Sequence, residues 1–396
     1  MTSNAITLSV TRLRAYRIDA LGAVLVAAGA AALLFLPFVL FKANRIVPGE
    51  PRALTELLPL WGNFACGATL ALAALIAVGV GDARVRLAAA LGGLVVVALA
   101  AAAAANALTP AGNRVVRVAA GPAFWVLLVV LGLMATDALT RLRPRPAMRV
   151  LYLALTLVVS VLVLAHGTFD NLSVMREYAV NAGRFMPEVR RHLWLALGSL
   201  GAAVIVALPL GIVCHRVPKL RPGVLGTLNV VQTIPAIALF GILMAPLGAL
   251  AAAAPWVSAL GIHGIGAAPA AVALFLYSLL PIVANTVAGL KRVSRSAVEA
   301  AHGMGMTEWQ VLTQVELPLA LPVILTGIRV VLVQNIGMVT VAALIGGGGL
   351  GTFVFQGIGQ TAIDLVLLGA IPIVVMAFSA ALLLDALVET LDRTKA

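Results

Sequence analysis

The stretch Glu299–Pro318, EAAHGMGMTEWQVLTQVELP, is polar, yet it lies between two long apolar runs at about 264–289 and 325–346. A membrane-spanning helix needs about 20 mostly apolar residues, and both runs are that long. The whole chain is 62% hydrophobic and only 11% charged, whereas a soluble domain averages about 25% charged residues. These features indicate a polytopic membrane protein in which the quoted stretch is a loop on one side of the bilayer.

Ten apolar runs of the 396-residue chain are long enough to cross a bilayer, so we expect an all-α fold with about ten transmembrane helices. They lie at roughly 20–41, 63–81, 87–106, 118–138, 149–166, 193–214, 224–245, 264–289, 325–346 and 364–388. The polar stretch 167–192 is either a surface helix or a linker. It separates an N-terminal membrane extension, 1–190, from a second half, 191–396.

The basic residues predict the orientation of these helices. The net charge is +12, and most Lys and Arg residues lie in short segments between apolar runs. With the N-terminus in the cytoplasm, about two thirds of them fall inside, as the positive-inside rule requires. This bias explains the positive charge without a nucleic-acid partner. We therefore expect a multi-pass protein of the inner (cytoplasmic) membrane, with both termini and the loop at 290–324 in the cytoplasm. The inward residues are Arg12, Arg14, Arg17, Arg84, Arg86, Arg141, Arg143, Arg145, Arg149, Arg216, Lys219, Arg221, Lys291, Arg292, Arg295, Arg329, Arg393 and Lys395.

The loop itself carries signals for two short helices. Ser296 and Glu299 have the spacing of a capping box, and so do Thr307 and Gln310. Glycines between the two boxes predict the end of the first helix. Pro318 either ends the second helix or turns it into the next span. Such a loop either receives a partner protein or only joins two spans.

The spacing in this loop resembles the EAA loop of ABC importer permeases. The matching residues are Glu299-Ala300-Ala301, then Gly305, then Val315-Glu316-Leu317-Pro318, with Val where the pattern has Ile. In that family the loop is a coupling helix that lies in a groove of the ATP-hydrolysing subunit. The resemblance implies a C-terminal five-helix type I ABC importer permease core. It also implies a coupling role for Glu299, Ala300, Ala301, Gly303, Gly305, Leu317 and Pro318.

Longer stretches narrow the resemblance to the osmoprotectant subgroup of these permeases. They include Gln232–Leu243, QTIPAIALFGIL, and Ala342–Gly351, AALIGGGGLG. Members of that subgroup import glycine betaine, choline, carnitine or proline betaine. The resemblance covers about 192–390, and a long N-terminal membrane extension is similar to one branch of the subgroup.

The chain lacks the residues of an ATPase. A P-loop needs Gly-Lys followed by Ser or Thr, and none of the four lysines follows a glycine. We therefore expect a transport subunit that is not an enzyme and binds no cofactor or metal. The expected partners are an ABC ATPase subunit that binds ATP, a second permease subunit (this chain or a relative), and a periplasmic or extracellular substrate-binding protein.

Uncharged polar residues within the second-half spans are candidates for the translocation path. Hydrogen bonding between helices is the other explanation for each of them. The path candidates are Gln232, Pro235, Tyr277, Asn285, Gln334 and Asn335. The glycines Gly346, Gly347, Gly348 and Gly349 are typical of a flexible turn or of an outer gate, and the resemblance favours the gate.

Three other functions stay open from the sequence. An ABC permease for another small solute, such as an amino acid, fits the loop equally well. An ion-coupled secondary carrier would need an ionisable residue near the middle of a span, and the acids Asp137, Asp364 and Asp385 lie at or near span ends. The third is a membrane scaffold or sensor without transport.

Overall fold

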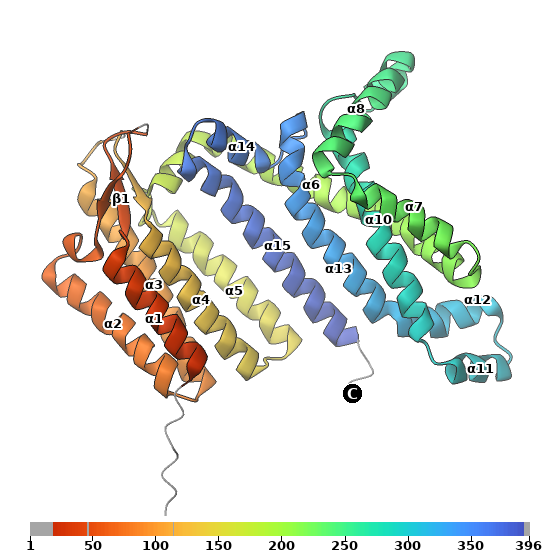
Figure 1. Ribbon diagram of the computed structural model, residues 1–396, viewed down its shortest axis with the longest axis horizontal. Helices are drawn as coiled ribbons and strands as arrows, with labels where there is room; N and C mark the ends of the chain where they lie inside the picture. Colours follow the sequence, from red (N-terminus) through yellow and green to blue (C-terminus); the bar gives the residue numbers. More distant parts are fainter. Residues whose placement is uncertain (1–18, 46, 114, 392–396) are drawn as a thin grey trace, which may run out of the picture. The chain divides into compact units, whose positions relative to one another are not determined.

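The computed structural model describes residues 19–391 except 46 and 114, so the basic residues expected near both termini lie outside the described residues (Figure 1). Those residues are Arg12, Arg14, Arg17, Arg393 and Lys395. The chain forms two compact units, Met1–Arg143 and Pro144–Ala396. Within the described part, nine helices are long and apolar enough to cross a membrane, and α1 is a shorter apolar helix of 16 residues. This architecture confirms the expected polytopic fold, which is mostly helical.

The first unit is a bundle of four helices with a small sheet at one end. Helix α3 packs against α2 and α4, and α1 packs against α2 and α4. Alanines allow close approach along α3, where Ala90, Ala100, Ala101, Ala104 and Ala105 are buried. The helices are α1 (Ala20–Phe35), α2 (Leu60–Gly79), α3 (Ala83–Leu108) and α4 (Pro122–Leu142).

The sheet was not expected from the sequence. Its antiparallel strands β1 (Val39–Lys42), β2 (Glu50–Arg52) and β3 (Arg117–Ala120) lie in the order β2-β1-β3, with Val39 opposite both Arg52 and Ala120. Most residues of β1 and β3 are apolar, so in the sequence they could not be separated from the apolar runs of the neighbouring helices. The runs at 20–41 and 118–138 therefore included β1 and part of β3.

Four charged side chains hold one end of the first bundle. Arg86 on α3 is only 1% exposed, and it pairs with Asp19 over 2.9 Å and with Asp137 over 3.0 Å. Arg141 on α4 pairs with the same two carboxylates, at 2.6 Å and 2.9 Å. The sequence had assigned both arginines to loops. The two carboxylates compensate the buried Arg86, which makes its desolvation tolerable, and the exposed Arg141 balances the second negative charge.

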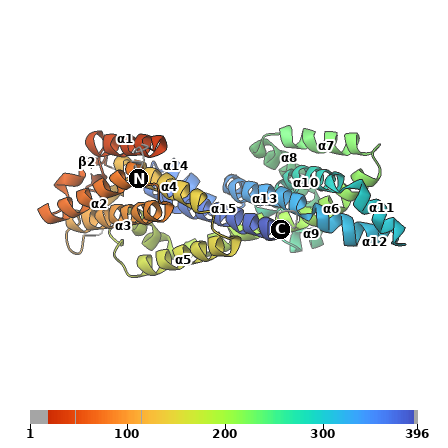
Figure 2. The same ribbon diagram turned by 90° about the horizontal axis from the view of Figure 1, so that it is seen from below.

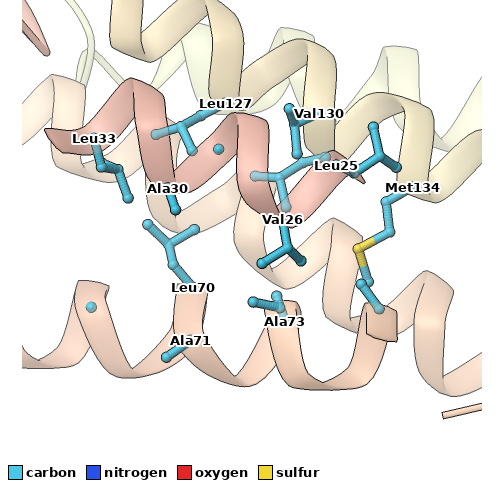
Figure 3. Close-up of a pocket in the computed structure, with 15 residues that line it drawn as sticks. Leu25, Val26, Ala30, Leu33, Leu70, Ala71, Ala73, Leu127, Val130 and Met134 are labelled. Carbon is cyan, nitrogen blue, oxygen red and sulfur yellow. The ribbon is translucent and has the colours of Figure 1, made fainter. Parts of the chain in front are cut away.

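An apolar cavity of about 250 Å³ lies between α1, α2 and α4 of this bundle (Figure 3). Leu25 and Val26 from α1, Leu70 from α2, and Leu127 and Met134 from α4 surround it. No polar side chain lines it. Its lining offers no hydrogen-bonding group that would recognise a polar solute.

The second unit contains one helix of unusual length, α6 (Ser173–Arg216), with 44 residues. It joins most of the polar stretch 167–192 to the following span without a break, so this stretch is not a separate linker. Pro187 and Pro209 lie inside the helix. The other helices are α5 (Pro146–Ala165), α7 (Arg221–Thr233), α8 (Ala236–Ala253), α9 (Pro255–Ala259), α10 (Ala267–Arg292), α11 (Arg295–Gly303), α12 (Glu308–Gln310), α13 (Leu317–Ala342), α14 (Gly351–Gly359) and α15 (Ile363–Leu391).

The span expected at 224–245 is two helices instead of one. Helix α7 ends at Thr233, and α8 begins at Ala236 after Ile234 and Pro235. Proline has no N–H to donate, and it disfavours helical backbone in the preceding residue. The prolines Pro281 and Pro372, in contrast, lie inside α10 and α15.

The core of the second unit lies between α6, α10 and α13, with α15 packed on α13. Helix α5 packs against α15, and Arg149 on α5 pairs with Glu389 over 2.9 Å and with Asp385 at 3.6 Å. These contacts explain why the two compact units separate at Arg143–Pro144, whereas the sequence placed a domain boundary near residue 190.

Candidate functional site

The loop between α10 and α13 folds into two short helices, α11 and α12, as expected (Figures 1 and 2). The capping box at Thr307 and Gln310 is present, with the Thr307 N–H donating to Gln310 Oε1 over 2.8 Å. The box proposed at Ser296 is wrong. Helix α11 begins two residues earlier, its N-cap is Ser294, and Glu299 instead pairs with Arg295 one turn away at 3.0 Å.

The turn at Gly303–Gly305, here called the glycine elbow, ends the first helix where the sequence predicted. Helix α11 ends at Gly303, and Gly305 follows with φ of +80°, a left-handed conformation that suits glycine and strains other residues. The Met306 N–H donates to the Ala301 carbonyl over 3.2 Å and so closes the turn. The elbow therefore fixes the angle between α11 and α12.

One face of this loop is exposed and the other is packed. Glu299 is 66% exposed, and Met304 and Trp309 are 72% and 70% exposed. Ala300 is exposed, but Ala301 is buried. The resemblance gave both alanines a coupling role, whereas only Ala300 contributes to the exposed face. A Trp side chain this exposed is unusual on an ordinary water-facing loop. Large aromatic side chains are, however, common at binding surfaces.

The loop joins the next span through a π-helical turn, Val311–Glu316. Leu317 and Pro318 lie in the first turn of α13, so Pro318 does not end the second helix. A π-helical turn has a shifted hydrogen-bond pattern, which fits a proline that lacks an N–H just beyond it. Leu312 packs with Leu290, Ala320 and Ile324, which anchors the turn in the protein.

A buried ion pair that the sequence did not single out ties this turn to α6. Glu316 is 4% exposed, and its carboxylate accepts a hydrogen bond from Arg216, at the end of α6. Arg216 also lies 4.0 Å from Glu308, which in turn lies 3.6 Å from His302. Glu316 occupies the unspecified position of the Ile-x-Leu-Pro pattern, so the pattern gave no signal for it.

Three of the path candidates meet at the break between α7 and α8. The Gln232 side chain donates to the Tyr277 carbonyl over 2.8 Å, and the Tyr277 hydroxyl donates to the Ile234 carbonyl just before Pro235. The Ile234 carbonyl is one of those left unpaired by the end of α7. Tyr277 on α10 therefore gives this carbonyl a hydrogen-bond partner and positions the break.

The other three path candidates lie elsewhere in the unit. Asn285 donates to the Pro281 carbonyl of its own helix over 2.8 Å. Gln334 is half-buried, and its amide approaches Met338 Sδ at 3.5 Å. Asn335 is fully buried and donates to hydroxyls of two other helices.

The four candidate gate glycines form a tight turn between α13 and α14. Gly346, Gly348 and Gly349 all have left-handed φ values, +76°, +74° and +85°. A side chain at Gly347 would meet the Ala342 carbonyl oxygen at 2.7 Å. Three positive φ values and one close backbone approach explain why this turn is built from glycine.

Three side chains of α6 hold this glycine turn. Glu188 accepts from the Gly349 N–H at 2.6 Å, and Arg191 donates through Nε to the Gly347 carbonyl at 2.7 Å. His192 is fully buried, and its Nδ1 accepts from the Leu350 N–H at 3.3 Å. Its Nε2 therefore carries the hydrogen that bonds the Ile336 carbonyl at 2.9 Å. The sequence gave these residues only as mixed charges in a polar stretch.

No constellation for metal binding is formed by the described residues, since no three His, Cys, Asp or Glu side chains come together there. Both cysteines, Cys66 and Cys214, are buried and free. The second unit thus has an exposed loop, a break between two helices with polar contacts, and a glycine turn held by side chains of α6. These features suit docking and conformational change.

Two family descriptions match different parts of the chain. Residues 204–396 match "Binding-protein-dependent transport system inner membrane component", and residues 19–175 match "ABC transporter permease YehY, N-terminal domain". The first match includes the loop, the helix break and the glycine turn.

Relatives of known identity are similar to the second half. The osmoprotectant import permease protein OsmW of Salmonella typhimurium is 44% identical over 197 residues, which are 50% of this chain and 86% of OsmW. The glycine betaine/carnitine/choline transport system permease protein OpuCB of Bacillus subtilis is 37% identical over 50% of this chain and 83% of its own. The solved structure of the MetNI methionine ABC transporter is 21% identical, with a TM-score of 0.47, over 53% of this chain and 96% of that chain.

Proposed function

The chain belongs to the family of binding-protein-dependent transport system inner membrane components, and from this premise we propose that it is the permease subunit of an ATP-driven importer of quaternary-ammonium osmoprotectants such as glycine betaine. One observation carries the substrate class: the 44% identity to an osmoprotectant import permease over 86% of that protein. OsmW and OpuCB supply the substrate class, which for this chain stays part of the proposal.

The partners follow from the same premise. A permease of this family works with an ATPase subunit and a substrate-binding protein. We assign ATPase docking to the exposed face of the loop, where Glu299, Ala300, Met304 and Trp309 are accessible together. The ATPase subunit binds the ATP. The loop and both termini are then cytoplasmic, the membrane is the inner (cytoplasmic) membrane, and the glycine turn faces the binding protein.

The path and the gate are assigned from geometry. The break at Ile234–Pro235 leaves backbone that is not helical inside a membrane unit, and such backbone is tolerated where it is buried in protein or lines a water-filled cavity. We assign the path to this break with Gln232, Pro235 and Tyr277, and to Gln334, Asn285 and Asn335 further along α10 and α13. We assign the outer gate to Gly346, Gly347, Gly348 and Gly349.

Uptake by the reconstituted importer tests this function. The chain would be placed in proteoliposomes with its ATPase subunit and binding protein, and ATP-dependent uptake of labelled glycine betaine, choline, carnitine and methionine would be compared. The proposal expects uptake of at least one quaternary-ammonium solute and none of methionine. Uptake of methionine alone would make the chain an amino-acid permease, and uptake without ATP would indicate an ion-coupled carrier.

A further inference from the structure

The buried carboxylate of Glu316 is the starting point. Removing a carboxylate from water is unfavourable unless a cation compensates it. Its compensating partner is Arg216, at the last residue of α6. The apolar side chains Leu208 and Ile212, also on α6, pack against the cluster that contains Leu312 of the π-helical turn. The loop is therefore joined to α6 by charge and by packing.

The first half of α6 is joined just as closely to the glycine turn, through residues 188–192. Glu188 and Arg191 bond to the turn, and His192 bonds to both sides of it. Phe185 also stacks on Phe353 of α14, with ring centroids 6.1 Å apart. One helix thus contacts the loop between α10 and α13, here called the coupling loop, at its last residue, and contacts the glycine turn at residues 188–192 in its first half.

The middle of α6 has little room to move independently of its neighbours. A side chain at Gly211 would meet Thr286 Cβ of α10 at 2.6 Å, so the two backbones approach closely. Ser199 on α6 is hydrogen-bonded to Asn335 on α13 over 3.1 Å. A displacement of one end of α6 is therefore transmitted through a packed helix with specific contacts along its length.

We propose that α6 transmits movement of the coupling loop to the glycine turn, with Arg216–Glu316 as the inner joint and Glu188–Gly349 as the outer joint. The inference rests on the proposed function, because it takes the ATPase subunit as the source of the movement. Arg216, Glu316 and Glu188 are positioning residues, which act on the gate through the helix and touch neither ATP nor substrate.

A labelling experiment that needs no substrate tests the proposal. Thr352, half-buried on α14 beside the turn, would be replaced by cysteine in a Cys66→Ala, Cys214→Ala background. The permease–ATPase complex in nanodiscs would then be labelled with a membrane-impermeant maleimide, without nucleotide and after trapping with ATP and vanadate. With both joints intact, we expect the labelling rate to differ by about fivefold between the two states.

Variants of each joint give the decisive comparison. Arg216→Gln and Glu188→Ala are each expected to remove the difference while the ATPase subunit still co-purifies. The exchange Arg216→Glu with Glu316→Arg is expected to restore it, because the ion pair is remade in reverse. Arg190→Gln, an exposed position on the same helix, serves as the matched control and should keep the full difference.

Two results would overturn the proposal. One is an unchanged difference in Arg216→Gln and Glu188→Ala. The other is loss of the ATPase subunit from the Arg216→Gln complex, since the ion pair would then only keep the loop folded. A wrong substrate class leaves this experiment untouched. Failure of the unaltered chain to bind any ATPase subunit would instead count against the proposed function.

Discussion

Asn335 on α13 donates a hydrogen bond to the Ser199 hydroxyl on α6 over 3.1 Å, and the same amide donates to Ser278 on α10 over 3.0 Å. All three residues are buried. Each serine hydroxyl also donates to a carbonyl of its own helix, at 2.6 Å. The three central helices are thus joined by the two N–H groups of one buried amide.

Replacing Asn335 by alanine distinguishes packing from a role in the path. If the amide serves packing, the complex should lose about 0.6–1.7 kcal/mol of stability, the range for hydrogen bonds between membrane helices, and transport should fall only in proportion to folded protein. Thermal melting and uptake would be measured on the same preparations. Gln334→Ala, on the adjacent half-buried position, is the comparison: a larger loss of uptake there, without loss of stability, supports a path that excludes Asn335.

Gly351 should tolerate no side chain. A Cβ at this position would lie 2.0 Å from the Thr340 carbonyl oxygen, whereas one at Gly337 would meet nothing within 4 Å. Overpacking typically destabilises by about 1–3 kcal/mol. Gly351→Ala should therefore melt at a clearly lower temperature than the unaltered protein, and Gly337→Ala should not. Equal melting temperatures for the two variants would show that α13 and α14 are not packed this closely.

Substitutions on the exposed face of the coupling loop should reduce binding of the ATPase subunit while the loop keeps its fold. Glu299→Lys removes only an exposed pair with Arg295, which is worth about 0–1 kcal/mol, so any large loss of ATPase binding comes from the docking surface. Gly305→Ile should also weaken docking, because isoleucine is strained at φ of +80° and the elbow angle would change. Co-purification of the ATPase subunit and membrane insertion would be measured together.

Gly226→Ala is the matched control for these variants, because Gly226 lies in helix α7 outside the loop and a Cβ there meets nothing within 4 Å. It should retain docking. Undiminished co-purification with Glu299→Lys and Gly305→Ile would rule out this face of the loop as the ATPase site.

Acid should weaken the first bundle through Asp19. A hydrogen bond from the Gly22 N–H, supported by Arg141 and Arg86, lowers the pKa of this carboxyl from 3.8 to about 2. Because the pKa is lower in the folded state, the stabilisation is fully present above pH 3.8 and is lost as pH falls toward 2. Thermal melting between pH 2 and pH 7 should show this loss.

Asp19→Asn should remove that part of the pH dependence and lower stability at neutral pH by about 1.5–3 kcal/mol, because Arg86 loses one of its two carboxylates and keeps Asp137. Asp82→Asn is the control, since Asp82 is exposed and only caps α3 at the Arg84 N–H. The role of Asp19 would be refuted by equal stability of Asp19→Asn and Asp82→Asn at neutral pH.

Local signals predicted the coupling loop well and its contacts poorly. The Thr307–Gln310 box and the glycine elbow depend on residues three or four apart, so the sequence carries them directly. The N-cap at Ser294 competed with Ser296, two residues away. Spacing alone does not distinguish two serines that can both cap.

The glycine turn likewise shows that local signals predict backbone conformation but not long-range contacts. Four consecutive glycines predict unusual backbone conformations, and three positive φ values are found. Nothing local indicates that Glu188, 161 positions away, bonds to this turn. In the same way, the Ile-x-Leu-Pro pattern leaves Glu316 unspecified, although its carboxylate is buried against Arg216.

The sequence by itself determined that this chain crosses a membrane many times and exposes a two-helix loop of the ABC permease type. Apolar run length, charge bias and short-range capping decide those features, and each is written within a few dozen consecutive residues. Only the tertiary structure decided that α6 is continuous, that α7 and α8 are separate helices joined to Tyr277, and that Asp19, Arg86, Asp137 and Arg141 form one cluster. These depend on which distant groups compensate buried charges and unpaired backbone, and burial is a property of the folded chain.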